Sequence, residues 1–179
     1  MRFPGPTHLV VLARYQGKGL TDWIEEKLEG WLGLEINREK TRVVKLNQEG
    51  EKLDFLGFTL RYDDDLEGRP WRYLNVVPSA KALKKERDKL YEMTNHHQCF
   101  KPIPQLIEEL NRNLRGWKNY FDFGYPRKAF RDLNTYVLGR LEQHLRRRSQ
   151  RPFCSRTRRR PPEGVSFYEQ IQRFGLIRL

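Results

Sequence analysis

Apolar and polar positions follow two different periods along the chain, and the change falls near residue 78. Before it, short apolar or alternating runs predict four strands, at residues 8–13, 42–46, 53–62 and 71–77. A single helix interrupts these strands. Thr21 is its expected N-cap, because acidic residues follow in the first turn, and Gly33 is expected to end it. The first part therefore predicts a small α+β unit.

Beyond Pro78 the spacing of apolar residues is helical. Ser79 is the expected N-cap of a helix that runs to about Asn95, and a second helix begins at the prolines near residue 103. The second helix has the clearest apolar face, formed by Leu106, Ile107, Leu110, Leu114, Trp117 and Phe121. Further helices are predicted at residues 130–145 and 166–173. This part therefore predicts a helical bundle.

These patterns divide the chain of 179 residues into three segments, at 1–77, 78–148 and 149–179. The first two are each small for an independent core, so we expect them to pack together. The predicted fold class is α+β, with a bundle of helices after a small sheet.

Charge is distributed very unevenly. Residues 1–77 hold 12 Lys/Arg and 13 Asp/Glu, whereas residues 78–179 hold 23 and 10, a net charge of +13. Between Arg140 and Arg160 there are nine arginines and one acidic residue, Glu142. Such a bias favours a polyanionic partner, most commonly nucleic acid, and arginine suits bidentate phosphate contacts. A solvated basic tail that only aids solubility is the alternative interpretation.

Other classes of protein are disfavoured. No apolar run reaches the roughly 20 residues of a membrane helix. Cys99 and Cys154 form no CxxC pair, which fits a reduced cytoplasmic protein. His96 and His97 lie close to Cys99, but a second pair of ligands is missing, so we predict no metal site.

Two motifs resemble the last two palm motifs of group II intron reverse transcriptases. They are Leu-Glu-Ile-Asn-Arg-Glu-Lys-Thr at 34–41 and Phe-Leu-Gly-Phe at 55–58. Residues 78–148, with Gly-Trp-Lys-Asn-Tyr-Phe at 116–121, are similar to the thumb, or maturase-specific, region of the same family, and the Phe-Gly-Leu at 174–176 is similar to its C-termini. The resemblance implies a partial palm at 1–77, a thumb at 78–148 and a basic C-terminal extension.

The resemblance also implies that catalytic aspartates are missing. The complete enzymes use Mg²⁺ held in part by an aspartate pair just before a strand like 9–14, whereas this chain has Thr7 and His8 there. We therefore expect no cofactor and no DNA polymerisation by this chain alone. Lys40 corresponds to a lysine near the incoming triphosphate; a solvated lysine beside a turn shaped by Asn37 and Thr41 is the favoured interpretation.

The remaining expected activity is binding of structured RNA or an RNA–DNA duplex. The candidate contacts are basic residues of the second and third segments: Arg112, Arg115, Lys118, Arg146, Arg147, Arg148, Arg151, Arg156, Arg158, Arg159 and Arg160. Two alternatives stay open, a piece of a split polymerase whose upstream fragment brings the aspartates, and a degenerate remnant of a mobile element. Self-association through an exposed strand at Leu9–Ala13 is a further expectation.

Overall fold

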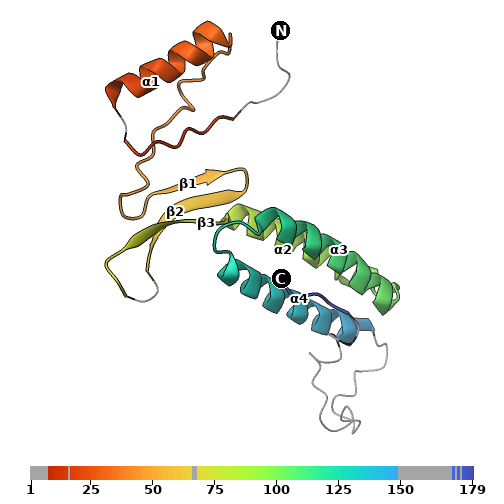
Figure 1. The fold of residues 1–179 in the computed structure, drawn as a ribbon. Helices are drawn as coiled ribbons and strands as arrows, with labels where there is room; N and C mark the ends of the chain where they lie inside the picture. Colours follow the sequence, from red (N-terminus) through yellow and green to blue (C-terminus); the bar gives the residue numbers. More distant parts are fainter. Residues whose placement is uncertain (1–7, 16, 66–67, 149–170, 172, 174) are drawn as a thin grey trace.

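The computed structural model describes residues 8–15, 17–65, 68–148, 171, 173 and 175–179, and contains a small sheet and a bundle of helices (Figure 1). The N-terminal elements are α1 (Lys18–Glu25), the π-helical segment η1 (Glu26–Trp31), β1 (Lys52–Phe55), β2 (Phe58–Asp64) and β3 (Arg72–Pro78). The later elements are α2 (Ala80–Met93), the 3₁₀ turn η2 (His96–Gln98), α3 (Ile103–Phe121) and α4 (Arg127–Arg148). The predicted α+β class is confirmed. No described helix combines the length and the apolarity that crossing a membrane requires.

Two predicted strands do not form. Residues 8–13 and 42–46 lie in irregular backbone, and Leu9 and Leu12 are 59% and 62% exposed. A strand satisfies its backbone groups through a neighbouring strand, and neither segment pairs with any strand that the structure describes. The expected self-association edge at Leu9–Ala13 is therefore not a strand edge.

The first helix also begins earlier than predicted. Gly17 is its N-cap, so the cap position offers no side-chain hydrogen bond, and Thr21 lies inside the helix. Gly33 follows the π-helical segment with φ +62°, the left-handed conformation expected of a glycine after a helix end. Trp23 and Trp31 are exposed, so the apolar side of this helix is open in the described part of the chain.

The Phe-Leu-Gly-Phe motif is a two-residue hairpin turn. The sequence predicted one continuous strand at 53–62, but Leu56 and Gly57 have φ of +48° and +84°, and Phe55 pairs with Phe58 across the turn. Positive φ at both central positions is what a type I′ turn requires, and this turn matches the natural twist of a hairpin. The motif therefore ends β1 and starts β2.

The three strands form one antiparallel sheet in the order β1-β2-β3. The strand predicted at 71–77 is confirmed as β3, and it pairs with β2, with Arg61 opposite Asn75. The buried amide of Asn75 donates a hydrogen bond to Asp63, at 2.6 Å. The strand was predicted to end at residue 62, but β2 continues through Asp63 and Asp64.

The predicted helical bundle is confirmed. The Ser79 hydroxyl accepts a hydrogen bond from the Ala82 amide, at 3.1 Å, as expected of an N-cap. The core lies between α2, α3 and α4, and includes the predicted apolar face of α3. Its least exposed apolar side chains are Leu90, Leu106, Leu110, Leu114, Leu133, Leu141 and Ile171. The predicted helix at 166–173 falls mostly outside the described residues.

A buried polar network from α4 caps the C-terminal end of α2. The Arg140 guanidinium donates to the Thr94 hydroxyl, at 3.1 Å, and to the Thr94 carbonyl, at 3.4 Å, and lies 4.3 Å from the centre of the Tyr91 ring. Nδ1 of His144, a fully buried side chain, is 3.2 Å from the same carbonyl. Carbonyls at a helix C-terminus lack intrahelical donors and carry partial negative charge, so these partners fix α4 against α2.

Glu86 of α2 is a buried carboxyl whose ionisation opposes folding. Burial raises the pKa of Glu86, against the opposing effects of Lys89 and a hydrogen bond from Asn113. Because the folded state holds this proton more tightly than the unfolded state, stability is greatest below the ordinary carboxyl pKa and falls as pH rises through the raised one.

We therefore expect Glu86→Gln to raise the thermal midpoint at pH 7. The amide oxygen keeps the acceptor for Asn113 and carries no charge to be buried. Below about pH 4 the wild-type carboxyl is protonated, so the two proteins are expected to melt together. Melting followed by circular dichroism between these pH values tests this; an advantage of the same size at both ends would contradict it.

Candidate nucleic-acid interface

Two motifs that are distant in sequence meet at the junction between sheet and bundle. The Phe58 ring stacks on Tyr120 with centroids 5.4 Å apart, and lies 4.9 Å from the Phe121 ring. The Tyr120 hydroxyl donates to the Leu56 carbonyl in the hairpin turn, at 2.8 Å, and the Ser79 amide donates to the Gly57 carbonyl, also at 2.8 Å. The hairpin is therefore fixed to the C-terminal end of α3 and the start of α2.

The turn between α3 and α4 closes the same junction from the other side. Gly124 has φ +79°, and a Cβ on it would lie 2.2 Å from the Val76 carbonyl oxygen of β3. The Tyr73 and Tyr125 rings meet edge to face, with centroids 5.6 Å apart. Tyr125 and Tyr120 thus make packing contacts, and both keep more than half of their surface exposed.

The candidate phosphate contacts on α3 differ in whether an acidic side chain already pairs with them. Arg112 is exposed but forms an ion pair with Glu108, at 3.5 Å. Arg115 is exposed and Lys118 is half-buried at the edge of the core face, and neither makes an ion pair with a described residue. Arg115 and Lys118 therefore present the uncommitted charges of this helix.

The arginine run is only partly described. Arg146 forms an ion pair with Glu142 on the same helix, whereas Arg147 is exposed and unpaired among the described residues. Arg148 ends α4, and its side chain is outside the description. The remaining candidates lie outside the described residues: Arg151, Arg156, Arg158, Arg159 and Arg160.

A row of lysines on α2 was missing from the sequence-based candidates. Its members are exposed and make no hydrogen bond or ion pair with described residues: Lys81, Lys84, Lys85 and Lys89. Spacings of three, four and eight place them on one face of the helix, opposite the buried Leu90. This spacing was visible in the sequence, but the denser arginine run outweighed it. We call these four residues the α2 lysine row.

Lys40 lies beside the predicted turn. The Asn37 side chain accepts a hydrogen bond from the Lys40 amide, at 3.1 Å, and the Thr41 hydroxyl donates to the Asn37 carbonyl, at 2.9 Å. The Lys40 residue is exposed. Asn37 and Thr41 thus shape the turn as predicted.

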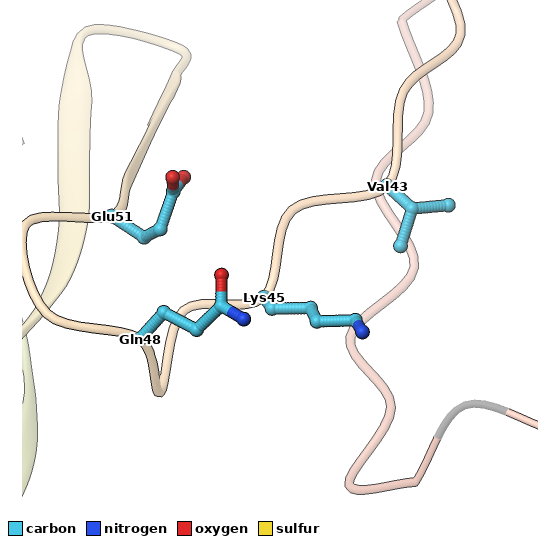
Figure 2. Close-up of a pocket in the computed structure, with 4 residues that line it drawn as sticks. All are labelled: Val43, Lys45, Gln48 and Glu51. Carbon is cyan, nitrogen blue, oxygen red and sulfur yellow. The ribbon is translucent and has the colours of Figure 1, made fainter.

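The described residues do not fit a metal site. No group of three or more His, Cys, Asp or Glu side chains among them is close enough to hold an ion, and Asp63 and Asp64 are engaged by Arg61 and Arg72. A surface hollow before β1 is lined by Val43, Lys45, Gln48 and Glu51, and Figure 2 shows these side chains spread along one loop rather than converging on one point.

Comparison with known families decides what the bundle is. Residues 83–161 match the family model "Group II intron, maturase-specific domain". This chain contains a group II intron maturase-specific domain. The domain covers most of α2 and all of α3 and α4, so the resemblance to the thumb region of a group II intron reverse transcriptase is confirmed. No curated protein matches the chain. Within the maturase-specific domain lie three of the four residues of the α2 lysine row.

Proposed function

We propose that this chain binds structured RNA or an RNA–DNA duplex through its maturase-specific domain. The observation that carries the proposal is the α2 lysine row, whose side chains are exposed and make no hydrogen bond or ion pair with described residues; three of its four members lie in that domain. Polyanion binding needs cations that are free to replace the counterions of phosphates. A cation already held by a carboxylate must first break its ion pair.

Further contacts come from the candidates predicted by sequence. Arg115, Lys118 and Arg147 carry free charge among the described residues. We retain the other arginines of the run, Arg148, Arg151, Arg156, Arg158, Arg159 and Arg160, on the strength of sequence charge alone. Contacts to phosphates position a protein without reading bases, so the expected binding is selective for nucleic-acid shape rather than sequence.

Salt dependence tests the proposal directly. Binding through at least six phosphate contacts predicts that affinity for an RNA hairpin falls about 1,000-fold between 50 and 200 mM salt. Fluorescence anisotropy across this range measures the slope, and replacing Arg146, Arg147 and Arg148 by Ala is expected to reduce it. Affinity that is insensitive to salt would contradict phosphate binding, and an unchanged slope in the triple variant would remove the arginine run from the interface.

We further propose that the chain alone does not extend a primer. The support is the sequence Thr7-His8 at the place where the family carries its aspartate pair. In a primer-extension assay with Mg²⁺ and an RNA template, no incorporation above a protein-free control is expected. Incorporation by the purified chain would overturn this expectation.

A second candidate is a subunit of a split polymerase. The exposed apolar residues near α1, including Leu12, Trp23 and Trp31, favour a protein partner that covers them. In that case incorporation is expected only when an upstream palm fragment carrying the aspartates is added, which the same assay distinguishes from RNA binding alone.

A further inference from the structure

Residues 175–179 lie as an extended segment across α3 and α4 (Figure 1). The Asn111 side chain of α3 makes two hydrogen bonds to its backbone. Nδ2 of Asn111 donates to the Gly175 carbonyl, at 2.8 Å, and Oδ1 accepts from the Ile177 amide, at 3.0 Å. The amide of one side chain thus spans two backbone groups separated by one residue.

Asn134 of α4 makes a second pair of hydrogen bonds further along the segment, both of them to one residue. Its Nδ2 donates to the main-chain oxygen of Leu179, at 3.3 Å, and its Oδ1 accepts from the Leu179 amide, at 3.1 Å. A residue on a neighbouring β-strand offers one donor and one acceptor in the same way. The two asparagines therefore recognise an extended backbone as a sheet edge does, although both are on helices.

Apolar side chains provide the rest of the contact. Leu176, Ile177 and Leu179 pack against the bundle core, and Ile171, upstream, is 1% exposed. Asn111 itself is only 8% exposed. Leaving the buried Asn111 side-chain amide without hydrogen-bond partners costs free energy. The surface around it therefore favours a bound segment that supplies backbone N–H and C=O groups.

The helices hold one another without the segment. The Trp117 and Phe130 rings join α3 to α4 with centroids 5.6 Å apart, and the Tyr136 hydroxyl donates to the Arg87 carbonyl of α2, at 3.3 Å. Among the described residues, the backbone of the segment makes its hydrogen bonds to the two asparagine side chains. Its removal therefore breaks no hydrogen bond between helices.

We propose that Asn111, Asn134 and the apolar surface beside them form a binding site for an extended apolar peptide, which we call the docking face. Residues 175–179 are its resident ligand and leave it without unfolding of the bundle. The inference does not depend on RNA binding, because it rests on backbone hydrogen bonds and apolar contacts and on no phosphate contact.

Hydrogen exchange of the full chain tests whether the segment leaves the docking face while the bundle stays folded. The Ile177 and Leu179 amides are expected to exchange more slowly than in a free peptide but at least tenfold faster than core amides of α3, because the segment opens by itself. Exchange at the rate of the α3 core would make the segment an integral part of the bundle. Full exchange at the free-peptide rate would mean that it does not dock. Either result overturns the proposal.

Binding of a separate peptide tests whether the docking face recognises an extended apolar peptide. In the full chain, Leu176→Asp with Leu179→Asp disables the resident segment and keeps the docking face. A fluorescent peptide of wild-type residues 171–179 is expected to bind this variant at least tenfold more tightly than wild type, where the tethered segment competes at high effective concentration. Adding Asn111→Leu and Asn134→Leu is expected to remove at least tenfold of that affinity.

Two outcomes of this experiment overturn the proposal. A peptide of scrambled sequence that binds equally well would show a nonspecific apolar contact, and equal binding with and without the asparagines would remove backbone recognition. Circular dichroism of the Leu176→Asp, Leu179→Asp variant settles whether the bundle persists when the segment is released; an unfolded variant would contradict a separable ligand.

Discussion

Replacing all four residues of the α2 lysine row by Gln is expected to weaken binding to an RNA hairpin roughly 100-fold at about 0.15 M salt. Each phosphate contact contributes about 0.7–0.9 to the slope of log K against log salt, so four contacts contribute roughly 3. Because 0.15 M is about 0.8 log units below 1 M, this slope corresponds to somewhat more than two orders of magnitude. Anisotropy titrations over a range of salt measure both the affinity and the slope.

Ion-paired arginines provide a control matched in charge. Each of them is held by an acidic side chain in the structure: Arg38 by Glu25 and Glu29, Arg61 by Asp63, Arg112 by Glu108, and Arg146 by Glu142. Replacing these four by Gln removes the same net charge as the lysine variant. Their charges are already compensated locally, so we expect a loss of less than about tenfold.

Comparing the lysine variant with the arginine variant distinguishes a specific binding surface from an effect of net charge alone. Equal losses in the two variants would mean that RNA responds only to total charge, and the α2 lysine row would have no special role. A larger loss in the arginine variant would place the interface on Arg112 and Arg146, the residues favoured by sequence alone. Substitution of exposed lysines on one helix is expected to leave the melting temperature nearly unchanged.

Gly124→Ala is expected to destabilise the protein by about 3 kcal/mol or more. Left-handed backbone costs a residue with a Cβ about 1–2 kcal/mol. The new Cβ would also lie 2.2 Å from the Val76 carbonyl oxygen, where the obstructing atom belongs to the backbone of β3. Either β3 or the turn between α3 and α4 must move, which disturbs the contact between Tyr73 and Tyr125.

Thermal denaturation measures this effect, as a fall of the midpoint by roughly 6–12 °C for a protein of this size. Gly139→Ala is the control: Gly139 lies in α4, is exposed, and a Cβ there would meet nothing within 4 Å. Alanine at such a helical position is expected to stabilise by up to about 1 kcal/mol. Two alanine substitutions with opposite signs would show that backbone position decides the result; a Gly124→Ala variant that melts like wild type would refute the close approach of turn and strand.

The amino-acid sequence by itself determined the helical half of this protein. The apolar face of α3 and the Ser79 cap are encoded within one or two turns of helix, because helical hydrogen bonds join residues four apart. The asymmetry of charge and the motifs at 34–41 and 55–58 were equally visible, since they need no partner to be recognised.

Only the tertiary structure decided the strands and the free charges. The apolar run at 8–13 lacks a strand to pair with, and the Phe-Leu-Gly-Phe segment turns because Leu56 and Gly57 both take positive φ. Whether Arg112 or Lys84 is free depends on which acidic side chain lies within reach. The pairing of Asn111 with Ile177 joins positions 66 residues apart. Strand pairing, ion pairing and backbone recognition all require a partner, and the partner's position is fixed only when the chain is folded.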